Sequence, residues 1–172
     1  MILDSLYAFD TSLVMVAGTT GAIGTTPSTN VISLRATGQI PVLANLQGAR
    51  DMGIGDNPAL KVSVNVVVAL TSGGAATLSV AFQGAPDDGT GNPGTFATYY
   101  ATPVYALATV AVVRSLMDID VPRPPAGVGM PAYYRLAYII AGATFTGGTL
   151  QSYLVLDRTD YIAYPVGLTV AN

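Results

Sequence analysis

The stretch LKVSVNVVVALTSGGAATLSVAF (residues 60–82) decides the fold class, because apolar side chains recur at every second position on both sides of a glycine turn. A period of two residues is the signature of a half-buried β-strand, whose side chains point alternately to the two faces of a sheet. Ser72, Gly73 and Gly74 separate the two runs, and a turn of this composition predicts a hairpin of two paired strands. The core face expected of these strands comprises Leu60, Val62, Val64, Val66, Val68, Leu70, Ala76, Leu78, Val80 and Phe82.

Six further segments are rich in β-branched and aromatic residues and are bounded by turn residues, so they are also expected to be strands. They are Ser12–Val16, Asn30–Leu34, Phe96–Ala101, Val110–Ile119, Tyr133–Ala141 and Thr149–Asp157. A turn is predicted at residues 145–148, and the proline-rich residues 121–131 are expected to form an exposed connection. About eight short strands without helical partners predict an all-β fold, a jelly-roll-like antiparallel β-sandwich, in a single domain spanning residues 1–172.

The chain is poor in charged residues. Its 172 residues include 7 basic and 10 acidic ones, 17 in all, and no His, Cys or Trp. Charged residues are 10% of the sequence, whereas globular proteins usually have about 25%. A lone folded molecule of this composition would expose much neutral and apolar surface to water. We therefore predict that other protein molecules cover a large part of its surface.

The missing residue types also exclude most catalytic chemistry. A Ser or Thr nucleophile needs a nearby base, but the chain has no His and no Cys, and its one lysine, Lys61, lies on a predicted strand. Asp118 and Asp120 share one face of a strand, where exposure to solvent or pairing with Arg123 is a simpler role than acid–base catalysis. The sequence therefore predicts no catalytic residue, and the protein is not expected to be an enzyme.

The acidic loop APDDGTGNPG (residues 85–94) is a candidate cation site, but it lacks the regularly spaced carboxylates of a calcium-binding loop. The glycine-rich segments Gly53–Gly55 and Gly127–Gly129 are not followed by a helical pattern, so they do not predict a phosphate-binding loop. The sequence therefore predicts no metal site and no cofactor.

Charge and hydropathy also limit the partners. The net charge is −3 and the seven basic residues are scattered, which gives no electrostatic footprint for nucleic acid or anionic lipid. No apolar run approaches the roughly 18–20 residues of a membrane-spanning helix. The N-terminal MILDSLYAFD lacks the basic flank and apolar core of a secretory signal. The sequence therefore predicts neither nucleic acid nor membrane as a partner, and a protein that stays in the cytoplasm where it is made.

Both ends of the chain, an N-terminal arm of residues 1–10 and a C-terminal arm of residues 159–172, are too apolar to be solvated tails. They are either edge strands packed on their own domain or arms that cross to a neighbouring subunit, and the sequence leaves both open. The side chains expected to make protein contacts are Ile2, Leu3, Leu6, Tyr7, Phe9, Tyr161, Tyr164, Leu168 and Val170.

The tyrosines are a second group of candidate contacts, because Tyr is frequent at protein and sugar interfaces alike. The pairs Tyr99-Tyr100 and Tyr133-Tyr134 each place one ring on either face of a strand. One ring of each pair is therefore expected in the core, and the other is either packed on the strand or an interface anchor.

Seven segments, in this order and spacing, resemble the small capsid cement, or decoration, proteins of tailed bacteriophages. They are MILDSLYAF (1–9), STNVISL (28–34), ARDMGIGDNPALKVSVNV (49–66), SGGAATLSVAFQ (72–83), VPRPPAG (121–127), YYRLAYIIAGATFTGGTLQSYLVLDR (133–158) and YPVGLTV (164–170). The resemblance implies a jelly roll that binds the outside of the capsid and bridges major capsid protein subunits as a symmetric homo-oligomer, a dimer or a trimer. It also implies a location on the virion exterior after synthesis in the bacterial cytoplasm.

An alternative is a carbohydrate- or receptor-binding β-sandwich module of a phage particle, in which exposed tyrosines stack on sugar rings. The absence of Trp and the scarcity of side chains for hydroxyl recognition weigh against it.

Overall fold

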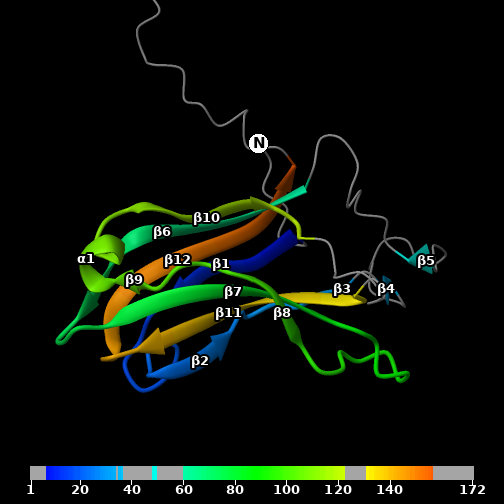
Figure 1. Cartoon of the computed structure of the whole chain (residues 1–172), viewed down its shortest axis with the longest axis horizontal. Helices are drawn as coiled ribbons and strands as arrows, with labels where there is room; N and C mark the ends of the chain where they lie inside the picture. Colours follow the sequence, from blue (N-terminus) through cyan, green and yellow to red (C-terminus); the bar gives the residue numbers. More distant parts are fainter. Residues whose placement is uncertain (1–6, 34, 37–47, 50–59, 123–130, 157–172) are drawn as a thin grey trace, which may run out of the picture.

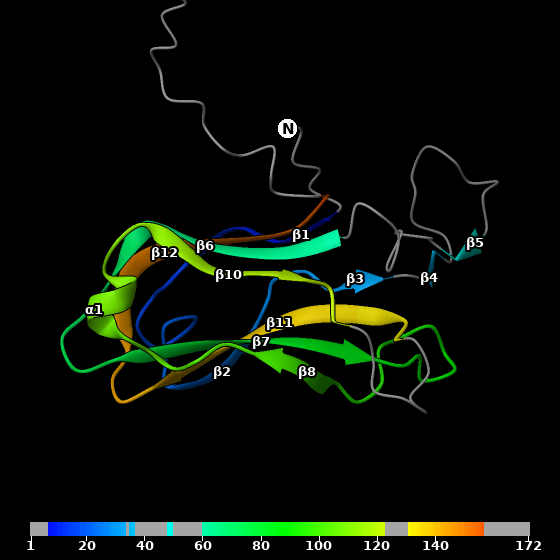
Figure 2. The same ribbon diagram turned by 45° about the horizontal axis from the view of Figure 1, so that its top comes forward.

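Two antiparallel sheets packed face to face form a β-sandwich in this computed structural model, which describes residues 7–33, 35–36, 48–49, 60–122 and 131–156 (Figures 1 and 2). Sheet A has the order β1 (Ala8–Val14), β12 (Phe145–Leu156), β6 (Leu60–Ser72), β10 (Arg114–Asp120). Sheet B has the order β2 (Gly24–Pro27), β11 (Tyr133–Ala141), β7 (Thr77–Ala85), β8 (Ala97–Ala101). The all-β antiparallel sandwich predicted from the sequence is confirmed.

Short elements complete the described part of the chain. They are β3 (Ile32–Ser33) beside β11, β9 (Tyr105–Ala106) beside β7, the separate pair β4 (Arg35–Ala36) and β5 (Gly48–Ala49), and helix α1 (Leu107–Val110). No helix among the described residues is long and apolar enough to cross a membrane.

The predicted hairpin between β6 and β7 is wrong. β6 pairs with β12 and β10 in sheet A, whereas β7 pairs with β11, β8 and β9 in sheet B. The turn at Ser72–Gly74 therefore carries the chain from one sheet to the other. This arrangement buries the apolar faces of both strands against each other, whereas a lone hairpin would leave its apolar face in water.

The predicted core face is buried at nine of its ten positions, and Val68 is the exception with 54% of its surface exposed. The pairing of β12 with β6 explains the exception. Leu150 lies opposite Val66 but Thr149 lies opposite Val68, so β6 carries one extra residue here. This β-bulge reverses the alternation and turns Val68 outward.

Several strand boundaries also differ from the sequence-based prediction. β12 begins at Phe145, and the chain turns at residues 142–144 rather than at 145–148. Gly142 has φ +79°, and a Cβ there would lie 2.3 Å from the Ala75 carbonyl oxygen, so this turn requires glycine. The strand predicted from Val110 begins at Arg114, because Val110 ends the helical turn α1, and β1 begins at Ala8 rather than Ser12.

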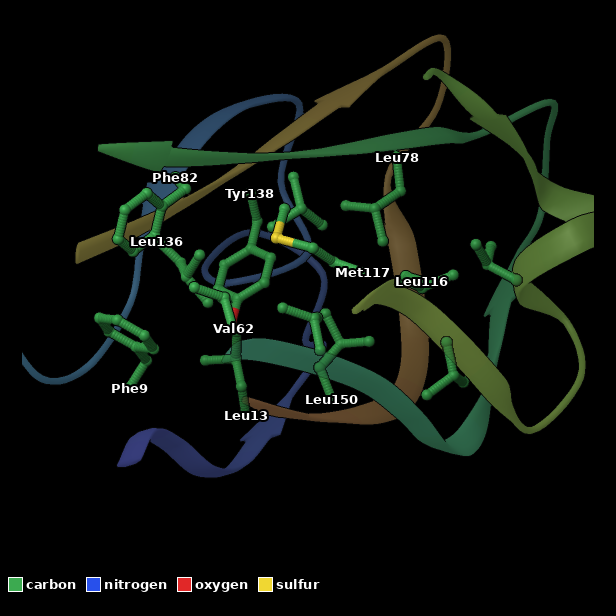
Figure 3. Close-up of a cluster of buried hydrophobic side chains, with 14 of the residues drawn as sticks. Phe9, Leu13, Val62, Leu78, Phe82, Leu116, Met117, Leu136, Tyr138 and Leu150 are labelled. Atoms are coloured by element: carbon green, nitrogen blue, oxygen red, sulfur yellow. The ribbon is translucent and has the colours of Figure 1, made fainter. Parts of the chain in front are cut away.

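The core lies between the sheets and contains a group of stacked aromatic rings. Phe82 of β7 stacks on Tyr134 of β11, with ring centroids 5.1 Å apart, and meets Phe9 of β1 edge to face at 6.2 Å. Figure 3 shows Tyr138 between the sheets, with its ring directed toward Leu13 and Val62. Rings from both sheets thus join the two layers.

Candidate interaction surface

The end of the sandwich that carries α1 collects most of the exposed apolar side chains. Strand pairing places several segments of the chain at this end (Figure 1). In sheet A, Val14 of β1 lies opposite Thr149 of β12. In sheet B, Thr77 of β7 lies opposite both Ala141 of β11 and Ala106 of β9. Of the ten exposed large apolar residues among those described, eight lie in this half of the molecule. These eight residues, here called the apolar end, are Val14, Val16, Ile23, Val68, Val104, Val112, Val113 and Ile139.

This end carries almost no charge. The segments that form it, residues 14–24, 68–77, 104–113 and 139–149, contain no Asp, Glu, Lys, Arg or His. Arg114, the first residue of β10, borders it. Val14 and Val68 belong to sheet A and Ile139 to sheet B, so the exposed apolar side chains surround this end of the sandwich on both outer faces. Exposed apolar side chains around an uncharged end of a domain favour its coverage by another protein.

Backbone register places part of the apolar end in one row across sheet A. Val14 lies opposite Thr149, which in turn lies opposite Val68. Directly opposed residues in antiparallel strands project from the same face, so the two valines flank Thr149 on the outer face of this sheet. The bulge next to Val66 is therefore what brings Val68 to the surface.

The predicted contact residues lie elsewhere. Phe9 has no exposed surface and is a core residue, which corrects its assignment as a contact with another protein, and Tyr7 is half-buried against the same core. The other seven, Ile2, Leu3, Leu6, Tyr161, Tyr164, Leu168 and Val170, lie outside the described residues. The start of β1 and the end of β12 lie at the end of the sandwich opposite α1 (Figure 1). The described residues that adjoin the two predicted arms therefore lie far from the apolar end.

Part of the N-terminal arm belongs to the domain. Ala8, Phe9 and Asp10 lie in β1, which pairs with β12 at the edge of sheet A. For these residues the structure supports the first of the two interpretations, an edge strand packed on its own domain.

Sequence reasoning missed the apolar end. Val112 and Val113 were assigned to a strand, and Val68 was assigned to the core. The one signal in the sequence is that Val110, Ala111, Val112 and Val113 interrupt the alternation of the surrounding segments, which is unexpected for a half-buried strand.

The prediction that one ring of each tyrosine pair packs in the core holds for both pairs. Tyr134 is fully buried, and Tyr99 packs partly against the core. Tyr133 faces outward but is covered, and its hydroxyl donates to the Gly91 carbonyl oxygen of the acidic loop. Only Tyr100, with 36% of its surface exposed, offers an accessible ring among these four.

The acidic side chains singled out from the sequence have structural partners. The Asp88 carboxylate accepts hydrogen bonds from the Thr90 hydroxyl and amide, at 2.7 Å each, and from the Asn92 amide at 3.2 Å. The Thr90 hydroxyl, followed by the amides, lowers the pKa of Asp88. Asp120 lies 3.9 Å from Lys61. No cluster of three potential metal-ligating side chains occurs in the described part of the chain.

A buried polar cluster joins the two sheets. Asp10 of β1 accepts hydrogen bonds from the Tyr138 hydroxyl at 2.6 Å, the Ser152 hydroxyl at 3.1 Å and the Thr29 amide at 2.8 Å. Burial, then the charge of Asp10 and the hydrogen bond to it, raise the pKa of Tyr138 well above its usual value. Asp10, Tyr138 and Ser152 are all buried, so this cluster has no access to a substrate and serves the fold.

The chain matches no protein-family model, and no curated protein sequence is significantly similar to it.

Proposed function

We propose that the protein is a decoration protein of a tailed-bacteriophage capsid, which binds the outer surface of the shell and bridges major capsid protein subunits. The observation that carries the proposal is the apolar end, because a soluble protein does not leave such an uncharged surface in water without a partner. The protein is further proposed to be non-enzymatic and to act as a symmetric homo-oligomer.

Two other features support the proposal. The order β1-β12-β6-β10 faces the order β2-β11-β7-β8, and the short β3 and β9 also pair in the second sheet. Eight main strands in two layers are expected for a jelly roll. The sequence segments that resemble phage cement proteins cover all of β11 and β12 and most of β6 and β7, which are the four central strands of the two sheets.

The work of such a protein is selective binding. A ligand that binds one state of a lattice and not another stabilises that state by mass action. Each contact is modest, but an oligomer that touches several shell subunits at once gains effective concentration. The oligomer therefore binds the shell far more tightly than a single subunit does. Uncharged contacts also predict that binding depends weakly on salt.

Charge substitutions at the apolar end test the proposal. Val68 and Val113 are 54% and 70% exposed, so Val68→Asp and Val113→Asp add charge without disturbing the core. Val31, which is 42% exposed and precedes β3 at the other end of the sandwich, provides a matched control in Val31→Asp. We expect the first two variants to lose co-sedimentation with phage shells and the control to keep it.

Two results would contradict the proposal. One is equal shell binding by all three variants when circular dichroism shows that each is folded. The other is saturable binding to one class of glycan without any binding to shells, which would favour the carbohydrate-binding alternative.

A further inference from the structure

The outer face of sheet B holds one arginine in a fixed position. The Arg135 Nε–H donates to Gln83 Oε1 at 2.8 Å, and the guanidinium carbon lies 3.8 Å from the centre of the Phe96 ring. Gln83 in turn donates through Nε2 to the Thr98 hydroxyl at 3.1 Å. Arg135, Gln83 and Thr98 are register partners on β11, β7 and β8, so three neighbouring strands and a stacked ring orient the guanidinium group.

The positive charge of this group has no counterion among the described residues. No carboxylate in that part of the chain lies within ion-pair distance of Arg135, and its two terminal nitrogens have no hydrogen-bond partner there. Lys61, by comparison, has Asp120 at 3.9 Å. Arg135 is half-buried, and burial lowers its pKa. A partly desolvated cation without a counterion favours the arrival of an anion.

We propose that Arg135 is a binding site for the carboxylate of an acidic side chain on a neighbouring protein molecule. With Nε bound to Gln83, the remaining N–H groups of the guanidinium present a planar fork, which matches the two oxygens of a carboxylate. The cost of ordering a long side chain is already met, because the Phe96 ring and Gln83 hold it in place before any partner binds.

The surroundings of Arg135 favour a protein carboxylate over a sugar acid or a nucleic acid. A sugar acid usually needs a free aromatic face, but the guanidinium group already covers Phe96. A polyanion such as nucleic acid needs several cations, and Arg135 is the only basic residue in the described strands of sheet B. Ile139 lies four residues along β11 on the same face with 39% of its surface exposed, which adds the apolar contact typical of a protein interface.

A titration with blocked tripeptides tests this site without any phage shell, so its result is independent of the proposed function. The full chain is titrated with acetyl-Gly-Glu-Gly-amide and with the uncharged acetyl-Gly-Gln-Gly-amide, and the Nε–H resonance of Arg135 is followed by NMR. We expect saturable shifts with the Glu peptide and an affinity at least about threefold higher than for the Gln peptide.

Two variants separate the fork geometry from charge alone. Arg135→Lys keeps the charge but loses the fork, so it is expected to remove the preference for the Glu peptide. Arg114→Lys makes the same change at an exposed arginine on β10 and is expected to leave that preference intact. Equal affinity for both peptides, or an unchanged preference in Arg135→Lys, would overturn the proposal. Tighter saturable binding of methyl phosphate or methyl glucuronide than of the Glu peptide would also overturn it.

Discussion

Tyr134 and Tyr138 project from the same face of β11 into the core, yet their hydroxyl groups meet opposite environments. The Tyr138 hydroxyl donates to Asp10 and is also 2.9 Å from the Ser152 hydroxyl. The Tyr134 hydroxyl is buried without a hydrogen-bond partner among the described residues. Burial, with a smaller contribution from Tyr99, raises the pKa of Tyr134 to about 12.

These environments predict opposite effects of the same substitution. Tyr134→Phe keeps the stack on Phe82 and removes an unsatisfied hydroxyl, so it is expected to leave stability unchanged or raise it by about 1 kcal/mol. Tyr138→Phe removes a hydrogen bond to a charged group, so it is expected to cost about 1.5–3 kcal/mol. Urea denaturation at neutral pH measures both, and equal losses in the two variants would contradict the assignment.

The raised pKa of Tyr134 adds a pH dependence to this prediction. The folded state holds the phenol proton more tightly than the unfolded state, whose tyrosine titrates at 10.0. The stability that depends on this group is therefore complete below pH 10 and is lost as the pH rises toward about 12. Tyr134→Phe is expected to lose less stability than the wild type as the pH rises from 10 toward about 12, measured by the same urea titrations.

Among the strands, β6 of sheet A is distinguished by two β-bulges in its pairing with β12. A second bulge follows the one at Val66, because Gly147 lies opposite Thr71 while Thr149 lies opposite Val68. Gly148, between them, has φ +106°, and a Cβ there would lie 2.5 Å from Leu70 Cδ2 and 2.6 Å from the Ala69 carbonyl oxygen. This glycine allows β6 to turn Leu70 back into the core after Val68 has faced outward.

Alanine substitutions at two glycines test this account. Gly148→Ala is expected to cost more than about 2 kcal/mol of unfolding free energy, since it forces a side chain into a left-handed conformation and against the neighbouring strand. Gly73→Ala is the matched control, because Gly73 has an ordinary φ and no atom within 4 Å of a new Cβ. Thermal or urea unfolding compares the two, and a similarly small cost at both positions would mean that the bulge tolerates a side chain.

The same bulges set the limit of what the sequence predicts. β11 and β7 pair without a register shift from Tyr133 opposite Ala85 to Ala141 opposite Thr77, and on β7 the alternation of apolar residues identified the core face correctly at Leu78, Val80 and Phe82. β6 lost the alternation at Val68 because a bulge depends on the partner strand, and β12 is separated from β6 by more than 70 residues of sequence. The apolar end was missed for a related reason, since its segments meet only after both sheets form.

In the whole molecule, the start of β1 and the end of β12 lie at the end of the sandwich opposite the apolar end (Figure 1). A truncation that asks whether the N-terminal arm binds a partner must therefore leave β1 intact. Deletion of residues 1–9 would remove Phe9, which meets Phe82 in the core, so loss of binding by that variant would report loss of folding. Deletion of residues 1–6 ends before the first described residue and keeps β1 whole.

The two truncations are expected to behave differently. Removal of residues 1–9 is expected to cost at least about 3–5 kcal/mol, the cost of emptying a phenylalanine site in a core, whereas removal of residues 1–6 should leave the urea midpoint near that of the wild type. Shell co-sedimentation of the shorter truncation then tests the arm by itself. If the apolar end supplies the main contact, this variant keeps most of its shell binding while Val113→Asp loses it. Complete loss of binding by the folded shorter truncation, together with normal binding by Val113→Asp, would instead assign the shell contact to the arm.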